Sequence, residues 1–320
     1  MAMPELFPTT VIGSMPRPPF VTDLLEAQAE GSVSSDDFRK RMDAAVDFVI
    51  ALQEHVGIDI ISDGEWRRLS YVDIVSEIMD GFELVDRPMF GGTQCVVRDM
   101  MPKKPGIVAE EARYLKDRSS CGVKVCLPSP YLIGTRCWEP DHSGNAYPTR
   151  EGFMEALVPV IREELLAVRE VGVDCVQLDE PHLCVFVDEG VRRSYGDPER
   201  QLTFGIDLLN QIVEGVDGVT IAVHLCRRNW GRMGWGASGG YEYLAPYLNR
   251  LENIDVLMTE FAIPAAGDMA VLKELREDFK IGLGCVDVRF EEIESPEKIA
   301  ARVEEAMDHV APERLLLNPD

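Results

Sequence analysis

The sequence predicts a single (β/α)8 barrel, the TIM-barrel fold of the α/β class, over residues 1–320. Short runs rich in Val, Ile and Leu recur along the chain, and segments with helical periodicity separate them. The runs do not alternate strictly with polar residues, which is typical of parallel strands covered on both faces. A doubly wound sheet is the alternative, but the expected Gly-x-Gly-x-x-Gly pattern does not follow the first run.

Eight of these runs are expected to be the strands of the barrel. In chain order they are Thr9–Ser14, Ile58–Asp63, Val123–Leu127, Cys175–Leu178, Val219–His224, Val256–Glu260, Lys280–Cys285 and Arg314–Leu317. No Ser/Gly-rich linker divides the chain, and 320 residues lie within the length of one such domain. Residues 82–104 are expected to form an extended excursion from the alternating pattern.

The segments between the runs carry helix start and stop signals. The expected N-caps are Ser34 or Ser35, Thr149, Asp197 and Ser295, and proline follows the last two at the first helical position. Gly57, Gly172 and Gly215 fall where helices should end. Tyr241, Tyr243 and Tyr247 are spaced as packing residues on one helix face.

The sequence ends at Asp320, directly after the eighth expected strand. A barrel of this kind normally closes with a helix packed over its last strand. We therefore expect that the final helix is missing from the given chain and that the barrel is truncated at its C-terminus.

The composition excludes several classes of protein. The chain carries 32 Lys and Arg against 56 Asp and Glu, a formal net charge of −24, which repels nucleic acid and anionic membranes. No apolar run is long enough to span a bilayer, and the N-terminus lacks the regions of a signal peptide. The eight cysteines form no Cys-x-x-Cys pair, so reduced, mostly buried thiols and a cytoplasmic location are expected.

Polar residues gather at the C-terminal ends of the expected strands, where barrel enzymes place their chemistry. His224 and Cys226 are two residues apart on one strand and therefore face the same side, and Glu260 ends the next strand. Imidazole, thiolate and carboxylate together suit zinc with an open coordination position. Such a zinc could activate a thiol for alkylation or a water for hydrolysis, and the thiolate ligand favours thiol chemistry. The alternative is a free cysteine beside a hydrogen-bonded histidine.

These residues resemble the catalytic barrel of cobalamin-independent methionine synthase, and especially the single-barrel proteins of that family. The resemblance covers most of the chain. Its motifs are Ile12-Gly13-Ser14, Asp63-Gly64-Glu65, Asp179-Glu180-Pro181, His224-Leu225-Cys226, Glu260 and Asn318-Pro319-Asp320.

The resemblance implies a zinc-dependent enzyme that methylates the thiol of homocysteine to give methionine. His224, Cys226 and Glu260 would be zinc ligands. Ser14, with the backbone at Gly13, would hold the carboxylate of the amino acid, and Glu65 and Asp179 would hold its ammonium group. A pair of carboxylates at a barrel mouth also suits a cation on electrostatic grounds alone.

The sequence departs from the family pattern in two ways. The family's last zinc ligand is a Cys directly after the closing Asn-Pro-Asp, and this sequence ends at Asp320. The full-length synthases also have an N-terminal barrel that helps to bind methyl-folate, so the donor here could be a methyl-folate or a methyl-corrinoid.

Two other functions remain open. One is transfer of an epoxide or alkyl group to another thiol such as coenzyme M, for which Arg17 or Arg67 should face the zinc to hold the sulfonate. The other is a non-catalytic barrel that binds a tetrapyrrole. The glycine-rich segment 227–240 is expected to be a mobile lid.

Overall fold

The computed structural model describes residues 4–68, 74–87, 92–228, 235–289 and 291–320, and it confirms the predicted barrel. A parallel sheet has the strand order β1-β4-β5-β6-β7-β8-β9. The strands are β1 (Ile60–Ile61), β4 (Gly122–Pro128), β5 (Cys175–Asp179), β6 (Thr220–His224), β7 (Val256–Glu260), β8 (Lys280–Val286) and β9 (Leu315–Pro319). Each lies within or overlaps the run from which it was predicted.

The first predicted strand closes the barrel without forming a regular strand. Thr9 pairs in parallel with Leu317 and Thr10 with Ile60, so this segment joins the two edges of the sheet, β9 and β1. The ladder stops there because the next carbonyls accept hydrogen bonds from side chains inside the barrel. Lys124 Nζ donates to Val11 O and Ile12 O, and Gln177 Nε2 also donates to Ile12 O at 2.7 Å.

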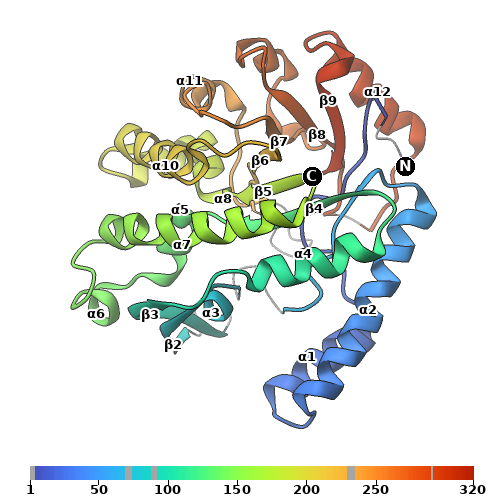
Figure 1. Cartoon of the computed structure of the whole chain (residues 1–320). Helices are drawn as coiled ribbons and strands as arrows, with labels where there is room; N and C mark the ends of the chain where they lie inside the picture. Colours follow the sequence, from blue (N-terminus) through green and yellow to red (C-terminus); the bar gives the residue numbers. More distant parts are fainter. Residues whose placement is uncertain (1–3, 69–73, 88–91, 229–234, 290) are drawn as a thin grey trace.

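Helices cover the outside of the sheet (Figure 1). The α-helices are α1 (Pro19–Ala29), α2 (Ser35–Val56), α3 (Ile74–Ile78), α4 (Ile107–Arg118), α5 (Pro130–Cys137), α6 (Pro140–Ser143), α7 (Arg150–Val171), α8 (Pro181–Cys184), α9 (Glu189–Ser194), α10 (Pro198–Val213), α11 (Ala245–Leu248) and α12 (Pro296–Met307). Short 3-10 helices are η3 (Val185–Val187), η4 (Tyr241–Tyr243), η5 (Pro264–Ala266), η6 (Met269–Glu274) and η7 (Pro312–Arg314). No helix in the described part of the chain is both long and apolar enough to cross a bilayer.

The expected excursion is a β-hairpin of β2 (Met79–Arg87) and β3 (Gly92–Pro102). Gly81 in β2 has φ +90°, and a Cβ there would lie 1.8 Å from the carbonyl oxygen of Asp99. Only glycine fits at that position, because the two backbones approach each other too closely for a side chain. In the described part of the chain β2 and β3 pair only with each other, so they add no strand to the barrel.

The predicted helix caps are confirmed. Ser34, Thr149, Asp197 and Ser295 each accept a hydrogen bond from a backbone N–H in the first turn of α2, α7, α10 and α12. Gly57 and Gly172 end α2 and α7 in the left-handed conformation. The predicted tyrosine helix is wrong, because Tyr241 and Tyr243 lie in the 3-10 helix η4 and Tyr247 in the separate α11.

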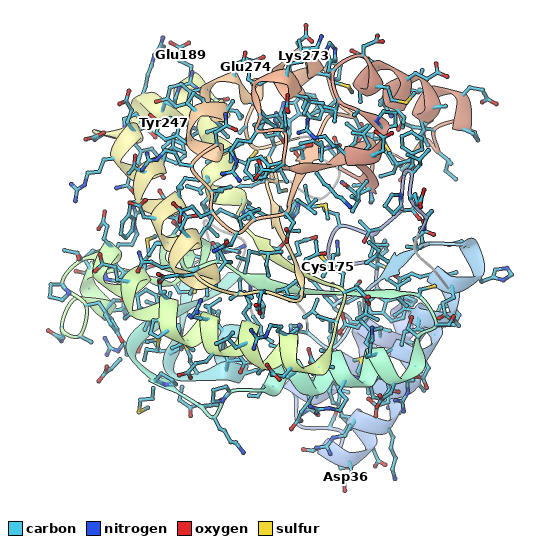
Figure 2. The ribbon with its side chains drawn as sticks, turned by 45° about the horizontal axis from the view of Figure 1, so that its top comes forward. Asp36, Cys175, Glu189, Tyr247, Lys273 and Glu274 are labelled. Atoms are coloured by element: carbon cyan, nitrogen blue, oxygen red, sulfur yellow. The ribbon has the colours of Figure 1, made fainter. Side chains whose placement is uncertain are left out.

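Buried side chains cover both faces of the sheet. One buried cluster fills the barrel interior and consists of Ile60, Cys175, Ala222, Val256, Met258 and Leu316. The larger cluster lies between the outer face of the sheet and the helices. Figure 2 shows Cys175 near the centre of the molecule and Asp36, Glu189 and Lys273 at its periphery. Burial on both faces explains why the strand sequences lack polar alternation.

Aspartates at the N-terminal ends of three strands tie neighbouring strands together. Asp59, just before β1, accepts hydrogen bonds from the backbone N–H and the hydroxyl of Thr9, both at 2.8 Å. In the same way Asp174 accepts from Val123 N at 2.8 Å and Asp255 accepts from Ile221 N at 2.7 Å. The three aspartates at this end of the barrel therefore share a structural role, which is to connect neighbouring strands.

Replacing Asp59 by Ala should lower the free energy of unfolding by about 1–3 kcal/mol, because two donors of Thr9 lose their acceptor at the closure of the barrel. Asp59→Asn should cost less, since an amide oxygen can still accept. Urea unfolding followed by circular dichroism measures both. Asp217→Ala is the control, because that side chain is 96% exposed. Equal stability of Asp59→Ala and the control would contradict this role.

Candidate metal centre and substrate pocket

His224, Cys226 and Glu260 converge as predicted at the C-terminal end of the sheet. One ligand atom from each lies within 4.8 Å of the others. The parallel register explains this, because His224 on β6 pairs with Met258 on β7, which brings Cys226 level with Glu260 two residues further on. The group offers nitrogen, sulfur and oxygen donors, the mixture that zinc binds in proteins.

The ring of His224 is oriented by Asp179. These two residues are register partners on β5 and β6, and His224 Nδ1 lies 3.1 Å from Asp179 Oδ1. The other ring nitrogen, Nε2, is buried and has no hydrogen-bond partner among the described residues. A carboxylate on one imidazole nitrogen and a free second nitrogen is the usual arrangement of a metal-binding histidine.

Two fully buried arginines hold Glu260. Its Oε2 accepts from the backbone N–H of Arg227 at 2.9 Å, and its Oε1 lies 3.1 Å from Arg289 Nη2. Glu260 is 2% exposed, and both arginines are fully buried. Burial and the neighbouring Glu260 raise the pKa of the Cys226 thiol well above its ordinary value. A metal cation bound at this position would favour the deprotonated thiol.

Tyr241 and the Arg227 side chain form the frame behind this centre. The Tyr241 hydroxyl accepts from Glu260 N at 2.9 Å and from Arg227 Nη1 at 3.0 Å. Arg227 also donates to the carbonyl oxygens of Gly239 and Ala266. These contacts connect the loops after β6 and β7, which carry the candidate ligands.

Asp320 lies beside the same centre. Its carboxylate accepts from Phe261 N and Ala262 N and bonds Arg289 Nη1 at 3.1 Å. Burial and the nearby Glu260 raise the pKa of Asp320 to about 7, although Arg289 opposes the shift. Arg289 therefore bridges two buried acids, Asp320 and Glu260.

The second predicted group, Gly13, Ser14, Glu65 and Asp179, lies at the same end of the barrel. The Ser14 hydroxyl donates to Glu65 Oε2, and a Cβ on Gly13 would lie 3.6 Å from Glu65 Oε1. That Oε1 is buried and has no hydrogen-bond partner among the described residues. Burial first, and then the negative charge of Asp179, raise the pKa of Glu65 to about 7.

The turn before Glu65 explains the Asp-Gly-Glu motif. Gly64 and Glu65 both have positive φ, at 68° and 54°. Asp63 Oδ1 accepts from Glu65 N at 2.9 Å and so stabilises the turn. A left-handed conformation at Glu65 costs about 1–2 kcal/mol, and it aims the carboxylate into the barrel mouth.

Lys124 and Gln177 were missed by the sequence analysis. Gln177 Nε2 donates to Asp179 Oδ1 at 2.8 Å, and Lys124 Nζ donates to Gln177 Oε1 at 2.6 Å. A chain of hydrogen bonds thus runs from Lys124 through Gln177 and Asp179 to His224. The available signal was the spacing of two residues between Gln177 and Asp179, which places both side chains inside the barrel.

The two arginines considered as sulfonate ligands are both engaged by other groups. Arg67 pairs with Asp43 at 2.9 Å and stacks on the Tyr114 ring. Arg17 Nη2 donates to the backbone oxygen of Glu65 at 2.7 Å. The expected lid falls partly outside the described residues, because positions 229–234 are not among them.

Comparison with known proteins identifies the family. A model described as the catalytic domain of cobalamin-independent synthase matches residues 7–320. The chain belongs to the cobalamin-independent synthase family. It is similar to methionine synthase of Saccharolobus islandicus (strain L.S.2.15 / Lassen #1), with 28% identity over 100% of this chain and 89% of the relative. It is also similar to methionine synthase of Sulfurisphaera tokodaii, with 28% identity over 98% of this chain and 85% of the relative.

Solved structures support the fold of this synthase-family barrel. A B12-independent methionine synthase from Shewanella sp. W3-18-1, in complex with selenomethionine, aligns with a TM-score of 0.78 and 24% identity over 98% of this chain and 90% of that one. A putative vitamin-B12 independent methionine synthase from Listeria monocytogenes aligns with a TM-score of 0.74 and 24% identity over the same shares of the two chains.

Replacing Tyr241 by Phe should weaken metal binding and lower the free energy of unfolding by about 1–3 kcal/mol, because Glu260 N and Arg227 lose a buried acceptor. Zinc affinity measured by competition with a chromophoric chelator, and unfolding in urea, test the two effects. Tyr247→Phe is the matched control, since Tyr247 lies in α11 away from these atoms. Wild-type zinc affinity in the Tyr241 variant would show that its hydroxyl does not support the centre.

Proposed function

We propose that this protein transfers a methyl group to the thiol of homocysteine, giving methionine, with zinc held by His224, Cys226 and Glu260. The observation that carries the proposal is the hydrogen bond between Asp179 and His224. It places an acid suited to an ammonium group directly beside a histidine suited to a metal. Membership of the cobalamin-independent synthase family and the similarity to methionine synthases support the same activity.

The residues present fit a zinc ion. The buried Nε2 of His224 has no other partner in the described structure, and the three donor atoms are close enough to close around one ion. When bound, zinc would lower the pKa of the substrate thiol and make a thiolate available at neutral pH. Arg227 and Arg289 hold the Glu260 carboxylate in place.

The pocket at Glu65 and Asp179 fits the amino-acid end of homocysteine. Glu65 Oε1 lacks a partner among the described residues, and the side-chain hydrogen bonds of Asp179 there all use Oδ1. An ammonium group between the two free oxygens would relieve the repulsion between the acids. The backbone beside Gly13 and Ser14 would then lie near the substrate carboxylate.

The transfer itself exchanges one bond for another. The sulfur of homocysteine forms a bond to the methyl carbon while the bond between that carbon and its donor breaks, and the thiol proton passes to solvent. The donor is a methyl-folate or a methyl-corrinoid. Alkylation of coenzyme M is less well supported, because Arg67, one of the two candidate sulfonate ligands, is engaged by Asp43 and Tyr114.

The activity test combines zinc-loaded protein, homocysteine and each methyl donor, and it detects methionine by mass spectrometry. Cys226→Ser should abolish methionine formation while the barrel stays folded, because a ligand at the open mouth contributes little to the core. Cys121→Ser is the control and should remain active, because Cys121 directly precedes β4, at the N-terminal end of the strands. Full activity in the Cys226 variant would rule out thiol activation at this centre.

Asp179→Asn should weaken binding of homocysteine and of methionine, because a neutral amide cannot balance the ammonium charge. The loss should be about tenfold or more, corresponding to at least 1.4 kcal/mol. Isothermal calorimetry with methionine measures it without involving a thiol. Asp217→Asn is the comparison, since the Asp217 side chain is 96% exposed. Equal affinity in wild type and Asp179→Asn would contradict the ammonium site.

Methionine binding should also depend on pH through Glu65. Its pKa in the free protein is raised to about 7, and only the carboxylate attracts the ammonium group. Affinity should therefore be full above pH 7 and fall as the pH drops below it, by up to about tenfold per pH unit. Glu65→Gln should bind weakly at every pH and lose this dependence. A wild-type affinity that stays constant between pH 6 and pH 8 would contradict the assignment.

A further inference from the structure

A second group of potential metal ligands lies beside the first. It consists of Glu65, Cys126 and Asp179, and one ligand atom from each lies within 4.8 Å of the others. Cys126 lies on β4, Asp179 on β5 and Glu65 in the turn after β1, and these three strands are adjacent in the sheet. Cys126 pairs in register with Gln177, two residues before Asp179, so its side chain comes from the strand next to that acid.

The donor atoms of this group are available. Glu65 is 4% exposed, and its Oε1 is buried without a hydrogen-bond partner among the described residues. The side-chain hydrogen bonds of Asp179 within the described structure use Oδ1, which leaves Oδ2 for a ligand. Among the described residues, the only hydrogen bond of the Cys126 thiol is a long one of 3.9 Å to the carbonyl oxygen of Ile12.

The charges around the group favour a cation. Two carboxylates face the same space, and the nearby Lys124 directs its ammonium group to Val11, Ile12 and Gln177 and not to either acid. Burial and the charge of Asp179 raise the pKa of the Cys126 thiol well above its ordinary value. A metal ion would replace the thiol proton and compensate both acids.

We propose that Glu65, Cys126 and Asp179 form a second, inhibitory metal site that takes zinc or a similar thiophilic divalent cation. The thiolate selects against magnesium and calcium, which prefer oxygen ligands. On binding, the cation displaces one proton from the Cys126 sulfur to solvent. No oxidation or group transfer is involved.

The site has a consequence for the enzyme that rests on the proposed function. Glu65 and Asp179 are the acids expected to hold the ammonium group of the amino acid, so the metal and the amino acid cannot occupy the pocket together. Excess zinc should therefore compete with substrate, whereas the zinc at His224, Cys226 and Glu260 supports catalysis. Cys126 distinguishes the two ligands, because the metal binds its thiolate whereas an ammonium group does not need it.

The test is a titration of the metal-free full chain with Co²⁺, whose thiolate complexes absorb in the near ultraviolet. Wild type should take up two equivalents. Cys126→Ser should keep the equivalent that depends on Cys226 and lose the other, with an affinity loss of about tenfold or more. Cys226→Ser should show the reverse pattern. Cys121→Ser, a control at the opposite end of β4, should keep both.

Further measurements separate the possible outcomes. Glu65→Gln should weaken the same equivalent as Cys126→Ser, which keeps the test valid if one variant folds poorly. Saturating methionine should displace only that equivalent. A Cys126→Ser titration identical to wild type overturns the second site. Loss of the equivalent in Cys126→Ser without any effect of methionine supports the metal site and contradicts the proposed ammonium pocket.

Discussion

The hydrogen bond between Asp179 and His224 is the contact on which the candidate site depends. The two residues are register partners on adjacent parallel strands, so the sheet itself sets their separation of 3.1 Å. A one-residue shift between β5 and β6 would turn one of the side chains out of the barrel and break the contact. Gln177 holds the same oxygen of Asp179, and the other carboxylate oxygen makes no hydrogen bond among the described residues.

The buried charges at the mouth are arranged in two different ways. Around Glu260, the fully buried Arg227 and Arg289 compensate the acid and fix its position. Among the described residues, no hydrogen bond joins an arginine to the carboxylate oxygens of Glu65 or Asp179. The pKa of Glu65 is raised to about 7. Buried ion pairs add little net stability, but they orient ligands. The first arrangement suits a ligand that must be rigid, and the second suits a pocket that binds a cation.

This difference links the proposed reaction to the proposed inhibition. An ammonium group and a divalent metal ion both relieve the repulsion between Glu65 and Asp179. Cys126 adds a sulfur donor that only the metal can use. Asp179 belongs to both groups, since its Oδ1 contacts His224 and one of its carboxylate oxygens lies within 4.8 Å of the donor atoms of Glu65 and Cys126. A cation bound at Glu65 and Asp179 would therefore lie directly beside the proposed zinc site.

The sequence by itself determined the barrel, seven of its strand positions, four helix caps and the group His224, Cys226 and Glu260. These follow from local patterns, because burial on both faces, capping and a spacing of two residues are visible in a short segment. The resemblance to a known family added Ser14, Glu65 and Asp179. Both sources left out Lys124, Gln177, Cys126 and the hydroxyl of Tyr241.

Only the tertiary structure reveals the roles of those residues, because these roles depend on contacts between strands and loops that are far apart in the chain. Cys126 has the sequence context of a core thiol, and only the register of β4 with β5 places it beside two acids. Tyr241 has the spacing of a packing residue, and only the loop after β6 brings its hydroxyl to Glu260. The first strand is the same case: its apolar run predicts a full strand, but Lys124 and Gln177 take its carbonyls after Thr10. Local pattern fixes which residues are buried, whereas hydrogen-bond partners are chosen when the barrel closes.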